Sequence, residues 1–226
     1  MNPVLWAILV SILIIAVVLQ LDRLRRKTTE ELRRVLLKEN DLKLYLQLLE
    51  NRHLHLLFSK ATLEHFRLEG YLLENDSDAV AASIARLDQA HLSRGERLDY
   101  DGEKLSWYCR RHETEQAEAV VKDMRSLLAD SKNEKDQAIL NDAELIERIY
   151  IKQDTSVIPE LKRLAESQNG SMRAITCFRI AKLYHFKQMD DQSAAYLKKA
   201  EGPAKGTGAE TMIRECRNDL SKLDVY

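Results

Sequence analysis

The first strong pattern in the chain is an apolar run over residues 3–21, PVLWAILVSILIIAVVLQL, which carries no charged side chain. A helix rises about 1.5 Å per residue, so this run spans roughly 28 Å, close to the hydrocarbon thickness of a bilayer. A cleaved signal peptide would begin with basic residues, and this chain has no Lys or Arg before Arg23. We therefore expect residues 1–27 to form an uncleaved single-pass membrane anchor with a basic flank.

The basic flank lies only on the C-terminal side of the run, at Arg23, Arg25, Arg26 and Lys27. The positive-inside rule then places the N-terminus outside and the rest of the chain in the cytoplasm. A bacterial cytoplasmic membrane is the preferred location, although a eukaryotic organelle protein with a cytosolic domain has the same layout. Two roles remain open for the four cations: contact with anionic lipid headgroups, or arrest of translocation alone.

Beyond the flank, the hydrophobic positions recur at helical spacing and strong helix formers dominate. The whole chain contains only three prolines and seven glycines, and alternating Val- and Thr-rich runs are missing. This pattern predicts an all-α fold. Residues 28–54 are expected to form a connecting amphipathic helix. Every seventh position from Leu21 to Leu63 is mostly leucine, but four of the seven positions three further on are charged or small and polar, so a coiled coil is only weakly indicated.

An arrangement of helix, polar turn and second helix recurs over residues 55–202. The turns read ENDSD (74–78), RHETE (111–115), KQDTS (152–156) and KQMDD (187–191), and each supplies Asp, Ser or Thr as an expected N-cap. A tyrosine precedes each turn, at Tyr71, Tyr108, Tyr150 and Tyr184. The pattern predicts helix pairs, and residues 203–226 are expected to add one terminal capping helix.

The last pair, RIAKLYHFKQMDDQSAAYLKKA (179–200), resembles the tetratricopeptide repeat (TPR), a helix-turn-helix unit that stacks into a superhelix. Ala181 and Tyr184 match the small and aromatic positions of the family's first helix. Ser193, Leu197 and Ala200 match the small, large and small positions of its second helix. The resemblance implies a TPR-like α-solenoid of antiparallel helix pairs. The earlier pairs depart from the family pattern, since they lack its Leu-Gly pair.

The same resemblance implies a concave groove, built by the first helices of each pair, that binds a partner protein. Its several cations favour an acidic or extended peptide segment as ligand. The alternative is that these are ordinary solvated surface residues. Aligning the tyrosines places the following side chains at the groove: Glu69, Ser106, Arg110, Arg148, Lys152, Lys182 and His185.

Composition and the remaining motifs narrow the classes of function. The formal net charge of −1 gives no field that would attract nucleic acid. Cys109, Cys177 and Cys216 are far apart and odd in number, which favours free thiols in a reducing compartment. The histidines show no metal-ligand spacing, and no phosphate-binding loop or nucleophile motif occurs. We therefore expect neither a metal, nor a cofactor, nor catalysis.

Three classes of function remain after these exclusions. The preferred class is a membrane-anchored protein–protein interaction scaffold with a cytoplasmic TPR-like domain. The alternative is a self-assembling structural component of a membrane or cell-envelope complex, a homo-oligomer built through the helix after the anchor. The least favoured class is an enzyme with an unrecognised site. The sequence leaves the identity of the partner open.

Overall fold

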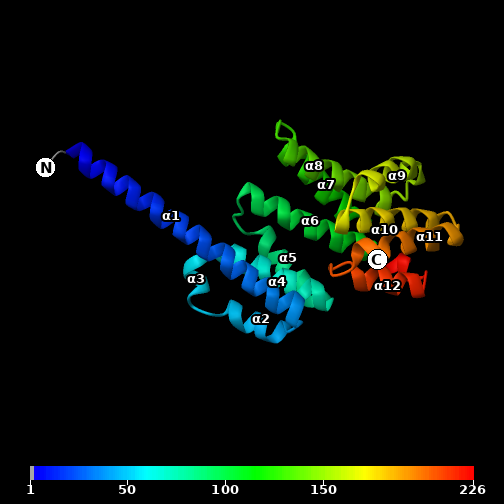
Figure 1. Ribbon diagram of the computed structural model, residues 1–226, viewed down its shortest axis with the longest axis horizontal. Helices are drawn as coiled ribbons and strands as arrows, with labels where there is room; N and C mark the ends of the chain where they lie inside the picture. Colours follow the sequence, from blue (N-terminus) through cyan, green and yellow to red (C-terminus); the bar gives the residue numbers. More distant parts are fainter. Residues whose placement is uncertain (1–2) are drawn as a thin grey trace. The chain divides into compact units, whose positions relative to one another are not determined.

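The computed structural model describes the backbone of residues 3–226, and the side chains of Trp6 and of residues 10–226. Every regular element in this part of the chain is helical, which confirms the predicted all-α class (Figure 1). The chain divides into two compact units, Met1–Arg97 and Leu98–Tyr226. The domain boundaries after residues 27, 54 and 202 stay predictions from the sequence.

Helix α1 (Pro3–Arg34) begins the first unit, and its two parts differ in exposure to solvent. Its apolar side chains from Val10 to Leu21 are exposed, with Leu13 at 64%. Its last turns pack through Leu32 into the core of the unit. Among Trp6 and residues 10–226, no helix combines the length and apolarity needed to cross a membrane. The predicted anchor, residues 3–21, lies partly outside the side chains that the structure describes.

The segment after α1 is not the single connecting helix that was expected over residues 28–54. A π-helical turn, η1 (Val35–Glu39), follows α1, and Asn40 then adopts a left-handed conformation with φ of 52°. The Asp41 side chain caps α2 (Leu42–Leu49) by accepting a hydrogen bond from the Leu44 amide at 2.8 Å. The prediction was wrong because Asn tolerates the left-handed region and Asp restarts a helix directly after it.

Helices α3 (Leu54–Leu57), α4 (Lys60–Glu74) and α5 (Ser77–Asp88) complete the first unit. The Tyr45 side chain of α2 is fully buried, and its hydroxyl donates a hydrogen bond to the Phe66 carbonyl of α4 at 2.8 Å. Helices α2 and α4 approach closely at Gly70, where a Cβ atom would lie 2.8 Å from Leu42 Cδ1. A larger residue at this position would require the Leu42 side chain to move and would press on the Tyr45 ring, whose nearest atom would lie 3.2 Å from the Cβ.

Helix α6 (Arg94–Arg110) begins just before the division at Arg97, and a series of helix pairs follows it in the second unit. Helix α7 (Thr114–Leu128) is followed by α8 (Glu134–Ile146), which ends in a π-helical turn, η2 (Glu147–Ile151). A short 3₁₀ turn, η3 (Thr155–Val157), leads into α9 (Ile158–Ser167). The unit ends with α10 (Gly170–Phe186), α11 (Asp190–Ala204), α12 (Glu210–Asn218) and α13 (Lys222–Val225).

All four predicted turns are confirmed, and they share one backbone feature. Each contains a left-handed residue two positions before the next helix, with φ between 48° and 58°: Asn75, His112, Gln153 and Gln188. In three of them the following amide donates to the carbonyl of the preceding tyrosine at 3.0–3.1 Å, a helix-ending motif that satisfies a terminal carbonyl; these carbonyls belong to Tyr71, Tyr108 and Tyr184. The tyrosine marker is therefore tied to the end of the first helix.

Two of the four expected side-chain N-caps are confirmed. Asp76 and Asp154 accept hydrogen bonds from amides of the following helical turns, as predicted. Glu113 and Met189 occupy the same place before α7 and α11 without a side-chain cap. In these two turns the polar side chains are not needed as caps, and the shared left-handed residue supplies the reversal of the chain.

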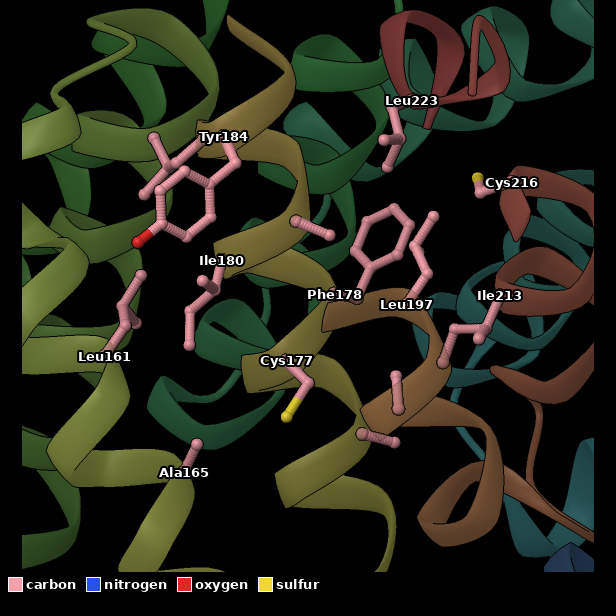
Figure 2. Close-up of a cluster of buried hydrophobic side chains, with 14 of the residues drawn as sticks. Leu161, Ala165, Cys177, Phe178, Ile180, Tyr184, Leu197, Ile213, Cys216 and Leu223 are labelled. Carbon is pink, nitrogen blue, oxygen red and sulfur yellow. The ribbon is translucent and has the colours of Figure 1, made fainter. Parts of the chain in front are cut away.

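The core of the second unit confirms the packing positions assigned in the last helix pair. Ala181, Ser193, Leu197 and Ala200 are all fully buried between α10 and α11. The Ser193 hydroxyl donates to the Ala181 carbonyl at 2.9 Å, so a polar side chain is satisfied inside the helix crossing. Figure 2 shows Phe178 beside Leu197 in this cluster, which also includes Ile213 of α12 and Leu223 of α13.

The single capping helix expected near the C-terminus is instead two short helices. The Asp219 carboxylate accepts hydrogen bonds from the Ser221 amide at 3.0 Å and from its hydroxyl at 2.7 Å. This local turn ends α12, because an Asp side chain that bonds two residues ahead competes with the helix ladder. Residues 219–226, here called the C-terminal segment, then fold back toward α10, where Leu223 is fully buried.

Candidate functional site at the end of helix α10

Three of the predicted partner-binding residues, Arg110, Lys182 and His185, surround the C-terminal segment. With His112 from the turn between α6 and α7, they form what we call the cationic face. The prediction had these side chains lining an open groove. The structure instead places residues of the C-terminal segment against them.

Lys182 is the centre of the cationic face and is only 2% exposed. Its ammonium Nζ donates a 2.5 Å hydrogen bond to the Leu223 carbonyl. It also lies 5.0 Å from the ring centroid of Tyr150 and 5.3 Å from that of Phe186, where the negative ring faces attract a cation. Burial lowers the pKa of Lys182 to about 8. Lys182 therefore holds the segment with a largely desolvated charge.

Two histidines bind the neighbouring residue of the segment, Asp224. His112 Nε2 lies 2.9 Å from the Asp224 backbone carbonyl oxygen, and His185 Nε2 lies 3.2 Å from its carboxylate oxygen. The Asp190 carboxylate approaches the other ring nitrogen of His185 at 3.5 Å. The face thus recognises both the main chain and the acidic side chain of one residue.

The last residue of the segment, Tyr226, is held by Glu215 of α12 at 2.6 Å. This hydrogen bond, together with burial, raises the pKa of Tyr226 to about 12. Arg110 also acts electrostatically on Tyr226, and burial lowers the pKa of Arg110 itself. The Arg110 guanidinium also lies 5.8 Å from the Trp107 ring centroid. Arg110 thus lies near both an aromatic ring of its own helix and the last residue of the segment.

Arg148 and Lys152 were placed at the same groove by aligning Tyr150 with Tyr184, and in the structure both are paired with neighbouring carboxylates. Arg148 pairs with Asp154 at 2.9 Å and with Glu160 at 3.6 Å. Lys152 pairs with Glu147 at 2.9 Å. The π-helical turn η2 inserts one residue, so that Tyr150 stands three positions before its left-handed residue rather than four. Both cations are neutralised by neighbouring carboxylates.

Two further predicted residues, Ser106 and Glu69, make contacts of their own. The Ser106 hydroxyl donates to the Gly102 carbonyl of its own helix at 3.0 Å. Glu69 belongs to the first unit and pairs with Arg33 of α1 at 3.3 Å. Sequence reasoning missed His112, although it lies in a predicted turn, and it missed the apolar and acidic residues at the end of the chain as possible contacts.

The lowered pKa of Lys182 predicts that the free energy of unfolding depends on pH. In the unfolded chain its amine keeps the ordinary pKa near 10.5, so between about pH 8 and 10.5 the unfolded state binds more protons than the folded state. The free energy of unfolding therefore gains a component that rises with pH, by about 1 kcal/mol from pH 8 to pH 9. Urea titrations of the wild type and Lys182→Met at both values measure it.

The Lys182→Met variant is the necessary reference because buried thiols act in the opposite direction. Burial raises the pKa of Cys109 to about 12, that of Cys216 to about 11, and that of Cys177 as well. Their unfolded forms lose protons first, which lowers the stability as the pH rises. Both proteins keep all three thiols, so the difference between them reports Lys182 together with its electrostatic effect on Cys109 and Cys216. An unchanged difference from pH 8 to pH 9 would contradict the lowering of the Lys182 pKa by burial.

In chemical terms, the cationic face holds a short piece of chain by one apolar side chain, two backbone carbonyls and one carboxylate. Each of these contacts is of a kind that recognises a peptide segment. Comparison with known protein families, with characterised proteins and with solved structures finds no match to this chain.

Proposed function

We propose that this chain is a membrane-anchored protein–protein interaction scaffold that binds an acidic, extended peptide segment of a partner. The observation that carries this proposal is the C-terminal segment seated on the cationic face. It buries Leu223 and presents the Asp224 carboxylate to His185. A partner segment with an apolar residue followed by an acidic residue would make the same contacts.

The TPR-like character of the helix pairs supports the same class of function. The four turns share one left-handed position, and the last pair buries the small and large residues that the resemblance assigned. Stacked helix pairs of this kind present extended faces to partner chains. The end of α10, which carries Lys182 and His185, would be the part of such a face that meets the partner.

A synthetic peptide with the sequence of residues 219–226, DLSKLDVY, tests the recognition directly. The full chain with Leu223→Ala should bind the labelled peptide saturably, because its own segment is held less firmly, and the wild type should bind it more weakly. Lys182→Met in the same background should reduce binding, since a hydrogen bond from a charged donor contributes about 1.5–3 kcal/mol. Fluorescence anisotropy measures each affinity.

The matched control is a peptide in which the position of Asp224 carries Lys and all others are unchanged. It keeps the apolar contact of Leu223 but opposes the charge of His185 when that side chain is protonated. Equal binding of the two peptides, or no binding of either, would contradict recognition of an acidic segment at this face.

The anchor is proposed from the uncharged run over residues 3–21, from the exposed apolar side chains of Val10 to Leu21, and from the four cations that follow them. In this orientation the two units face the cytoplasm. The wild type should stay with membranes after carbonate washing, whereas a variant without residues 3–21 should be released. A third protein with an unrelated apolar run in their place should again stay. Release of the wild type would contradict the anchor.

A self-assembling structural protein is the second candidate, and the exposed apolar side chains of α1 favour it too. These side chains would then pack against α1 of another copy rather than against lipid alone. Analytical ultracentrifugation of the full chain in detergent separates the two candidates. A monomer would remove self-assembly, and a discrete oligomer that dissociates on polar substitution of Leu13 would support it.

A further inference from the structure

The fold brings a second basic segment beside the flank of the proposed anchor. Arg25 Nε of α1 donates a hydrogen bond at 2.8 Å to the Leu57 carbonyl, 32 residues away in the sequence. Figure 1 shows α3 lying next to α1 within the first unit. The residues around α3 are therefore fixed at the level of Arg25 along the helix.

Both segments carry exposed cations. In the flank, Arg23, Arg26 and Lys27 are exposed, and Arg25 lies 3.9 Å from Asp22. Residues 51–63 contain no acidic residue. The preceding acid, Glu50, is already paired with Arg67 at 2.6 Å. The exposed titratable side chains of this second segment are Arg52, His53, His55 and Lys60.

An exposed leucine lies in the middle of these cations. Leu56 is 79% exposed, more than Leu13 in the outer part of α1, which is 64% exposed. Its neighbour Leu54 points into the core of the unit and is 8% exposed. A short helix thus turns one leucine inward and presents the other outward among basic side chains. This combination of basic and apolar groups is typical of surfaces that bind membrane interfaces.

The depth of this surface fits a headgroup layer. Arg25 lies four residues beyond Leu21, the last residue of the apolar run, which corresponds to roughly 6 Å along a helix. The polar layer on each side of a bilayer is about 5–7 Å thick. The hydrogen bond from Arg25 to Leu57 would therefore lie within the headgroups once residues 3–21 occupy the hydrocarbon.

A small cavity extends the cationic surface into the first unit. It has a volume of about 330 Å³, and its lining includes His55, Lys60, Arg67 and Arg86 against a single carboxylate, Glu64. Glu64 already pairs with Arg86 at 2.7 Å and with Arg67 at 3.2 Å. The lining keeps an excess of positive charge, as a site for a phosphate-bearing headgroup requires.

We propose that these groups form a juxtamembrane surface that binds anionic lipid, with the basic side chains on the headgroups and Leu56 inserted among them. This proposal rests on the proposed membrane anchor. The surface comprises Arg23, Arg26, Lys27, Arg52, His55, Leu56 and Lys60. It fixes the first unit against the bilayer, so that the anchor and α3 together define two points of attachment.

The full chain with Leu56→Cys tests this surface in phosphatidylcholine vesicles made with or without phosphatidylserine. The three native cysteines are buried, so a water-soluble maleimide reports mainly on position 56. Phosphatidylserine should slow the reaction by at least about fivefold, the factor expected for one basic residue in contact with anionic lipid. Arg52→Ala in the same protein should raise the reaction rate in the phosphatidylserine vesicles again by about fivefold.

The matched control is Leu73→Cys, which replaces a leucine that is 57% exposed at the opposite end of α4 from α3. Its reaction rate should be the same in both kinds of vesicle. Equal rates at position 56 in both kinds of vesicle, or equal slowing at positions 56 and 73, would overturn the proposed lipid surface.

Quenching of Trp6 by brominated lipid separates failure of this surface from failure of the anchor. Trp6 belongs to the apolar run of α1, whereas the other tryptophan, Trp107, is buried in the second unit. Quenched Trp6 with no protection at position 56 overturns only the lipid surface. Unquenched Trp6 overturns the anchor, and the lipid surface with it.

Discussion

Replacing Phe178 by Ala should lower the free energy of unfolding of the second unit by about 3–5 kcal/mol. The Phe178 side chain is 1% exposed and belongs to a cluster that joins α9, α10, α11, α12 and α13. Figure 2 shows its ring beside Leu197, at the centre of this cluster. Alanine would leave a cavity that rigid neighbours on several helices cannot fill.

The matched control for this prediction is Met172→Ala on the same helix. Met172 is 58% exposed, so its truncation should change the free energy of unfolding by no more than about 0.5 kcal/mol. Urea titrations followed by Trp107 fluorescence report on the second unit, in which this side chain is 3% exposed. Equal shifts for Phe178→Ala and Met172→Ala would contradict a core centred on Phe178.

The four helix pairs could be located from the sequence because their signals are local. Polar residues interrupt the apolar spacing at each turn, and Asn75, His112, Gln153 and Gln188 tolerate the left-handed backbone that reverses the chain. The small residues of the last pair were predictable for the same reason. A close helix crossing requires them at fixed positions, and Ala181 and Ser193 are buried there.

The register of the third pair could not be predicted, because a π-helical turn leaves no mark in the composition. The residues of Glu147–Ile151 are typical of an ordinary α-helix. The structure shows a π-helical turn, in which the Lys152 amide donates to the Glu147 carbonyl, five residues earlier, at 3.0 Å. Glu147 is buried there and pairs with Arg125 at 2.7 Å. An alignment by tyrosines therefore shifts Arg148 and Lys152 by one residue relative to the left-handed position of their turn, Gln153.

The residues of the candidate site could not be predicted from local sequence patterns either, because they make contact across large separations in the sequence. Lys182 and Leu223 are 41 residues apart, and His112 and Asp224 are 112 residues apart. The sequence identified three of the cations but gave no sign that the chain itself covers them. Only the turn at Asp219, which redirects the last residues toward α10, brings the two together.

Replacing Leu223 by Ala should raise the rate of chemical modification of Cys216 by at least about 100-fold. Leu223 is the only fully buried side chain of α13, and Cys216 of α12 is fully buried in the same cluster. Leucine-to-alanine changes at such sites cost about 2.7 kcal/mol or more. Each 1.36 kcal/mol changes an equilibrium tenfold, so local opening of the C-terminal segment should become correspondingly more frequent.

Mass spectrometry of each cysteine after a timed pulse of iodoacetamide measures this effect. Val225→Ala is the matched control, because Val225 lies in the same short helix and is 58% exposed. Cys177 of α10 is the internal reference for unfolding of the whole unit. An equal rise at Cys177 and Cys216 would mean that the segment opens only when the unit unfolds, and an unchanged Cys216 would mean that Leu223 does not hold it.

The local opening measured in this way also sets the affinity of a partner. If the cationic face is free in only a small fraction of molecules, the apparent dissociation constant of a competing peptide is its intrinsic constant divided by that fraction. Leu223→Ala should therefore raise the reactivity of Cys216 and the affinity for the 219–226 peptide by the same factor. A rise in reactivity without a rise in affinity would mean that the segment covers Cys216 but not the binding face.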